Sequence, residues 1–242
     1  YTSGWDELRR QRYQRMINMG LIDKKWPLSP RDPEALPWDD VQDKQLMDRK
    51  MAVYAAQIDI MDRGVGQILE ELKKQGKAEN TLVMFLSDNG ACHEGGALGF
   101  DRRNSGVAIG GVDSYASYGR SWSNAGNTPF RMHKHWVHEG GIATPLIVRW
   151  PNTIKERGGL TNQVGHIVDV MATCCDVAGI DYPGEINGRA IEPLQGKSLT
   201  PVFNSELRDG HEYLFWEHMG NKAVRKGEWK LVSKDRGAWE LY

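Results

Sequence analysis

The sequence has only three cysteines, and two of them, Cys174 and Cys175, are neighbours, so disulfide bonds cannot provide its framework. It has no apolar run of the length needed to span a bilayer, and we expect no transmembrane segment. It also has no excess of one charge, since 31 basic and 32 acidic residues give a formal net charge of −1. A general nucleic-acid-binding surface is therefore not expected. Any anion must be bound by a local group of side chains.

The chain has 242 residues, of which 40% are hydrophobic, which is enough for one large α/β domain or a main domain with a small appendage. Residues 4–20 predict a charged surface helix that ends at a glycine. Apolar residues at helical spacing from 43 to 75 predict a long helix with one buried stripe. A further helix is predicted from 165 to 178, before Gly179.

Two short apolar runs, residues 81–86 and 145–150, are typical of strands buried on both faces of a parallel sheet. Between them, residues 88–142 are rich in Gly, Ser, Asn and His without periodicity, and a loop region of that length is usually functional. Alternating segments at 213–216, 222–225 and 228–232 predict a small antiparallel sheet. We expect residues 1–200 to form the main α/β domain and 201–242 a small β subdomain.

Asp88 and Asn89 directly follow the first predicted strand. Ligands of open α/β sheets collect at the carboxyl ends of strands, where loops leave the core. A carboxylate beside an amide oxygen suits a hard cation such as calcium or magnesium. An Asp-Asn-Gly sequence is also a common turn, and this alternative stays open.

A second polar cluster lies in residues 127–145, just before the second predicted strand. It contains Arg131, Lys134, His133, His135 and His138 in a chain that is otherwise balanced in charge. A lysine and an arginine together suit the oxygens of a sulfate or phosphate. A solvated basic turn and a zinc site built from the histidines are the alternatives.

Several segments together resemble the carboxy-terminal half of type I, formylglycine-dependent sulfatases, and bacterial arylsulfatases most of all. The segments are 87–90 (SDNG), 127–131 (NTPFR), 134–141 (KHWVHEGG), 144–151 (TPLIVRWP), 166–173 (HIVDVMAT) and 196–199 (GKSL). The resemblance implies an alkaline-phosphatase-like α/β fold, with a mixed sheet flanked by helices and a small C-terminal antiparallel sheet. It also implies hydrolysis of small-molecule or carbohydrate sulfate esters, and suggests export to a periplasm or outside the cell.

The family pattern also implies roles for individual positions. Asp88 and Asn89 match ligands of a single active-site calcium ion, Lys134 matches the lysine that binds a sulfate oxygen during catalysis, and His138 is expected to line or support the pocket. The formylglycine nucleophile of the family derives from a Cys-x-Pro-x-Arg motif, which this sequence lacks. We therefore expect the nucleophile upstream of Tyr1, and this fragment alone to be inactive.

Two other functions remain open from the sequence. The first is a phosphatase or phosphonate hydrolase of the same superfamily, because sulfate and phosphate esters present similar tetrahedral anions. The second is a truncated sulfatase-like protein that binds sulfated ligands or metal without catalysis. A Cys-x-Pro-x-Arg segment in the same native chain would distinguish an enzyme from such a binding protein.

Overall fold

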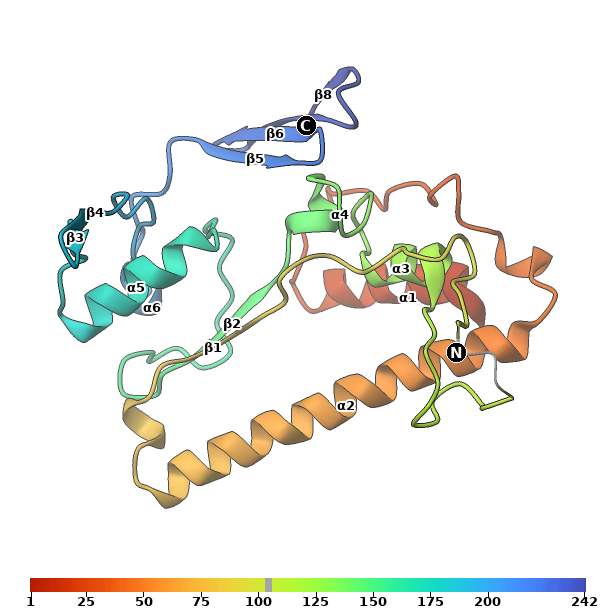
Figure 1. Cartoon of the computed structure of the whole chain (residues 1–242), viewed down its shortest axis with the longest axis horizontal. Helices are drawn as coiled ribbons and strands as arrows, with labels where there is room; N and C mark the ends of the chain where they lie inside the picture. The colour runs from red at the N-terminus through yellow and green to blue at the C-terminus, as the bar shows by residue number, and fades with distance from the viewer. Residues whose placement is uncertain (103–105) are drawn as a thin grey trace.

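A mixed α/β arrangement extends along one long helix in the computed structural model, which describes residues 1–102 and 106–242 (Figure 1). The helices are α1 (Gly4–Asn18), α2 (Lys44–Lys74), α3 (Gly119–Gly126), α4 (Glu139–Ile142), α5 (Val168–Ala178) and α6 (Thr200–Phe203), with 3₁₀ turns η1 (Trp38–Asp40) and η2 (Ala78–Asn80). The strands are β1 (Val83–Leu86), β2 (Leu146–Arg149), β3 (Glu185–Ile186), β4 (Arg189–Ala190), β5 (Leu214–His218), β6 (Asn221–Lys226), β7 (Trp229–Ser233) and β8 (Trp239–Leu241).

The three predicted helices are confirmed as α1, α2 and α5. The side chain of Asp43 caps α2 by accepting a hydrogen bond from the backbone N–H of Leu46 at 2.9 Å. Gly179 ends α5 with a left-handed backbone (φ 65°), a conformation that glycine adopts without steric cost. Local capping residues therefore set the start of α2 and the end of α5.

The predicted buried stripe of α2 is wrong for most of its length. Met47 and Lys50 are its buried residues, whereas Ile58 is 43% exposed and Ile68 is 63% exposed. Figure 1 shows α2 running along one edge of the molecule, with few of the described elements against its central turns. The helical period identifies an apolar face, but it does not determine whether this chain covers that face.

The prediction of parallel strands buried on both faces is also wrong, because β1 and β2 pair antiparallel, from Val83 opposite Arg149 to Leu86 opposite Leu146. Ile147 of β2 is 62% exposed. A continuous apolar run does not specify strand direction. The antiparallel register brings the end of β1 beside the start of β2, so the polar segments that adjoin these ends meet.

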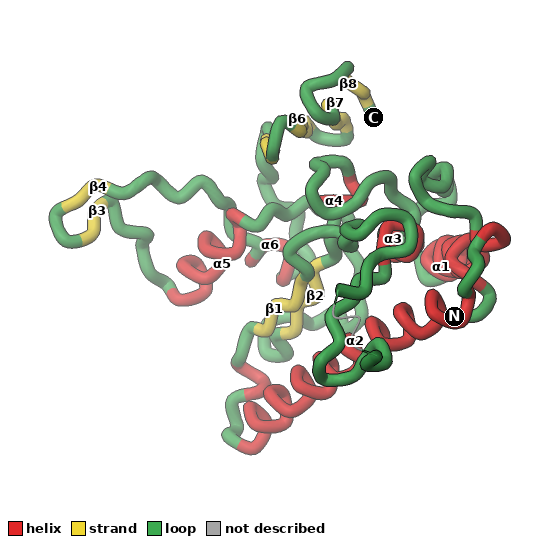
Figure 2. The backbone as a smooth tube through the Cα atoms, turned by 45° about the vertical axis from the view of Figure 1, so that its right-hand side comes forward, coloured by secondary structure: helices red, strands yellow, loops and turns green. Residues whose placement is uncertain are grey.

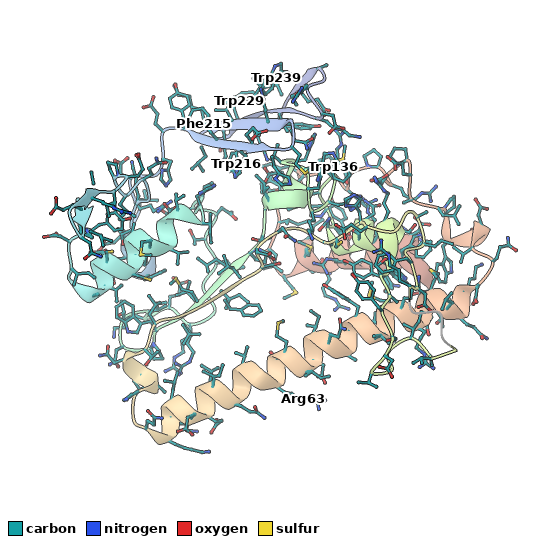
Figure 3. The ribbon with its side chains drawn as sticks, viewed as in Figure 1. Arg63, Trp136, Phe215, Trp216, Trp229 and Trp239 are labelled. Carbon is teal, nitrogen blue, oxygen red and sulfur yellow. The ribbon has the colours of Figure 1, made fainter. Side chains whose placement is uncertain are left out.

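The small C-terminal antiparallel sheet is confirmed, with strand order β5-β6-β7-β8. On one face, Trp216, Ala223 and Val232 pack against Val137 from the segment before β2. Figure 3 shows Trp216 on the side of the sheet nearest Trp136, with Phe215 and Trp229 away from it. One face of the sheet therefore covers the segment that carries Lys134 and His138.

A tryptophan cluster forms the core around α1 and α3. The ring of Trp5 meets the rings of Trp38 and Trp122 edge-on, with centroids 4.7 and 5.2 Å apart. The sequence did not predict α3, since its residues GRSWSNAG have weak helix propensity. Burial of seven of its eight residues favours the helix there.

Asp169 at the start of α5 is fully buried and joins three separate segments. Its carboxylate accepts hydrogen bonds from the backbone N–H groups of His166 and Lys197 at 2.9 Å, from Arg208 at 2.8 Å, and pairs with His211 at 2.6 Å. Burial alone would raise the pKa of the Asp169 carboxyl, but these donors outweigh burial and hold the pKa below its usual value.

We expect Asp169→Asn to lower the free energy of unfolding by about 3 kcal/mol at neutral pH, because Arg208 loses its buried charge partner. The depressed pKa makes this contribution complete above the unfolded pKa of about 3.9, and it is lost as the pH falls through the folded pKa. Urea unfolding at several pH values tests both points. The difference in the free energy of unfolding between wild type and variant should become smaller below about pH 4. Asp181 is exposed, so the Asp181→Asn control should leave the free energy of unfolding unchanged.

Candidate active site

The segment after β1 and the segment before β2 are joined at the edge where Leu86 lies opposite Leu146. Gly90 donates its backbone N–H to the carbonyl of Gly141 at 2.8 Å. The hydroxyl of Thr144 donates to the carbonyl of Ser87 at 2.9 Å. The two polar clusters predicted from the sequence are therefore parts of one site. Figure 2 shows that the chain between β1 and β2 is mostly loop.

Glycines allow this contact to be very close. A Cβ atom on Gly90 would lie 1.7 Å from the carbonyl oxygen of Gly140, and one on Gly140 would lie 2.2 Å from that of Arg131. Both neighbours are backbone atoms, so neither can rotate away. The two segments thus meet backbone to backbone at positions where a side chain does not fit.

Asn127 and Lys134 extend the connection on the other side of Gly90. The side chain of Asn127 accepts from the N–H of Ala91 at 2.8 Å and donates to the carbonyl of Met132 at 2.9 Å. The backbone N–H of Lys134 donates to the carbonyl of Ala91 at 3.0 Å. The backbone of Lys134 is therefore bound to Ala91, two residues after Asn89, within the same hydrogen-bonded unit.

Asp88 is exposed and Asn89 is half-buried. The amide nitrogen of Asn89 donates to the carbonyl of Gly90 at 2.8 Å, which leaves its amide oxygen as the available donor atom for a cation. Within residues 1–102 and 106–242, no group of three or more His, Cys, Asp or Glu side chains is placed to hold a metal ion. A carboxylate and an amide oxygen fit a hard cation, and they would supply two of its ligands.

The Lys134 side chain remains 45% exposed, and its ammonium lies 4.0 Å from a carboxylate oxygen of Glu94. An exposed ion pair at that distance is weak. The Lys134 ammonium can therefore leave Glu94 and bind an anion at little cost in free energy.

His138 lies on the other side of the same segment, buried beneath the C-terminal sheet. Its Nε2 is 3.9 Å from a carboxylate oxygen of Glu240 in β8, and neither ring nitrogen has a hydrogen-bond partner among the described residues. Burial lowers the pKa of His138 to about 4, so the ring is neutral at pH 7. The structure thus places His138 between the Lys134 segment and the sheet.

His133 belongs to a buried network that the sequence did not predict. Its Nδ1 lies 2.6 Å from the hydroxyl of Ser123 and its Nε2 lies 2.7 Å from the carboxylate of Asp32, which also pairs with Arg120 at 3.2 Å. Both ring nitrogens are occupied, so His133 does not fit a zinc ligand. Asp32 lies 101 residues away in the chain, and the sequence gives no local signal for this contact.

Comparison with known proteins decides the family. The profile of the family described as "Sulfatase" matches residues 7–180. This chain belongs to the sulfatase family. A second profile, "N-sulphoglucosamine sulphohydrolase, C-terminal", matches residues 130–242 of this sulfatase chain.

Curated relatives agree with this assignment. An uncharacterized sulfatase of Schizosaccharomyces pombe is 31% identical over 100% of this sulfatase chain and 47% of its own length. An arylsulfatase of Klebsiella aerogenes is 32% identical over 86% of the chain and 47% of its own length. The chain thus spans about half the length of these curated relatives.

A solved structure supports the fold. The crystal structure of Ps i-CgsB in complex with k-i-k-neocarrahexaose matches with a TM-score of 0.57 at 22% identity, over 98% of this sulfatase chain and 48% of that chain. The expected mixed α/β fold with a C-terminal antiparallel sheet is confirmed. No helix in the described part of the chain is long and apolar enough to cross a membrane.

We expect Gly90→Ala to destabilise the protein by about 2 kcal/mol or more, because the added methyl group would collide with the carbonyl of Gly140. Thermal unfolding measures the loss. Gly184→Ala is the matched control, since a Cβ atom there meets nothing within 4 Å. Equal stability of the two variants would contradict the close backbone contact.

Proposed function

We propose that this sulfatase chain contributes to a sulfuric ester hydrolase of the arylsulfatase type, with Lys134 binding a sulfate oxygen and Asp88 and Asn89 binding a calcium ion. The observation that carries the proposal is the hydrogen bond from the Lys134 N–H to the carbonyl of Ala91, combined with the Gly90–Gly141 contact. These bonds join the backbone of a residue with a cationic side chain to the segment that carries the Asp88 carboxylate and the Asn89 amide. The matching family profile supports sulfate as the anion.

Charge stabilisation explains the role of Lys134. Sulfuryl transfer develops negative charge on the sulfate oxygens and on the leaving oxygen, and fixed positive groups stabilise that charge. A calcium ion, when bound, supplies a second positive group beside the sulfate. The ammonium of Lys134 is free to turn towards the anion, because its contact with Glu94 is long and exposed.

The nucleophile is proposed to come from outside this sequence. Neither Cys92 nor the Cys174–Cys175 pair lies in a Cys-x-Pro-x-Arg context. This chain would then supply part of the calcium and sulfate site, and we expect it to be inactive by itself. Mass spectrometry of the native protein would identify a formylglycine in the same polypeptide; its absence there would favour a non-catalytic binding protein.

A phosphatase or phosphonate hydrolase is the second candidate function. A lysine beside two hard-cation ligands also suits a phosphate oxygen, so the described site does not by itself exclude phosphate esters. Hydrolysis of 4-nitrophenyl sulfate and 4-nitrophenyl phosphate by the complete native protein separates the two. Preference for the phosphate would overturn the sulfatase activity proposed here.

We expect Lys134→Ala in the complete native protein to lower kcat for 4-nitrophenyl sulfate by about two orders of magnitude, equivalent to ~3 kcal/mol of lost transition-state stabilisation. Lys155→Ala is the control, because the Lys155 ammonium is exposed and donates only to the nearby carbonyl of Asn152 within the described residues. Turnover of the Lys134 variant close to that of wild type would exclude this lysine from the sulfate site.

A further inference from the structure

His135, next to Lys134, has an unusual backbone conformation. Its φ is 96°, in a region that residues with side chains adopt rarely, and Met132 in the same loop also has a positive φ of 66°. Strained residues of this kind persist where the surrounding contacts hold them, and they cluster at functional sites. Buried Trp136 supports the imidazole of His135 edge-on, with ring centroids 5.1 Å apart.

His218 approaches the same place from the C-terminal sheet. It is the last residue of β5, and a two-residue turn of Met219 (φ 50°) and Gly220 (φ 88°) leads into β6. Fully buried Asn221 donates to the carbonyl of His218 at 3.0 Å and accepts from the N–H of Asp235 at 3.1 Å. The hairpin thus fixes the position of His218 while its side chain stays exposed.

The two imidazoles lie against each other, and one of them adjoins Lys134 in the chain. Their ring centroids are 5.3 Å apart with an interplanar angle of 80°, and neither side chain has a hydrogen-bond partner among the described residues. His135 directly follows Lys134, so a sulfate held by Lys134 would have this pair as a near neighbour. The part of the ester that reaches the pair is then the leaving group.

We propose that His135 and His218 form a subsite for the leaving group and that they select hydroxyl-rich, carbohydrate sulfate esters. This inference rests on the proposed sulfatase function. An imidazole in its neutral form offers one hydrogen-bond donor and one acceptor, which matches the paired donor and acceptor character of a sugar hydroxyl. A nitrophenyl group has no hydroxyl that could pair with this donor and acceptor. The C-terminal sheet therefore contributes to substrate choice.

The test compares two substrates in the complete native protein, N-acetylglucosamine 6-sulfate and 4-nitrophenyl sulfate. His218→Ala should raise KM for the sugar sulfate by about tenfold, as expected for a lost hydrogen bond, with kcat and all values for the aryl sulfate nearly unchanged. His218→Gln, which keeps a donor and an acceptor, should restore part of the affinity. Lys222→Ala is the control, since this exposed side chain lies on the other face of the sheet.

The outcomes are distinct. Wild type that hydrolyses neither sulfate overturns the proposed function and this inference with it. Wild type that hydrolyses only the aryl sulfate overturns the inference alone. Equal losses on both substrates in His218→Ala would mean a structural role for His218, and no loss on either would mean no role, so each contradicts the subsite.

Discussion

The backbone of Gly90 lies directly against the backbones of Gly140 and Gly141, and the candidate active site depends on this contact. The antiparallel register of β1 and β2 brings the two segments to the same edge. Asn127 then bonds to both, and Lys134 is placed relative to Asp88 and Asn89 by backbone hydrogen bonds. Backbone contacts hold such a geometry more firmly than long side chains do, because they have fewer rotatable bonds to order.

The sequence predicts the polar clusters and the presence of α1, α2 and α5, because these features arise from local patterns. It does not predict α3, whose helix depends on burial, or the network of Asp32, Ser123 and His133, because Asp32 lies 101 residues from His133 in the chain. The sequence also does not predict that β1 and β2 run antiparallel. The same apolar run can form a strand in a parallel or an antiparallel sheet, so the strand direction depends on the tertiary structure.

The C-terminal sheet is bound to the active-site segment through both apolar and charged contacts. Val137 packs beneath Trp216, Ala223 and Val232, while Lys230 donates to Glu139 and Arg131 to Glu240. Lys230 is buried, and burial lowers the pKa of its ammonium, so its pairing with Glu139 compensates for a desolvation cost. Arg131 and Glu139 connect the sheet to the loop, whereas the Lys134 ammonium is near Glu94 and takes no part in these contacts.

The long separations of these contacts along the chain affect when the site forms. Asp32 meets His133 across 101 residues, and Arg131 meets Glu240 across 109. At a translation rate of about 5–20 residues per second, His133 would be synthesised roughly 5–20 seconds after Asp32. Glu240 would follow Arg131 after a similar interval. The loop that carries Lys134 therefore lacks its outer support until β8 has been synthesised. During that interval, the nascent chain would present an incomplete site to chaperones, and Val137 would stay uncovered until β5, β6 and β7 have been synthesised.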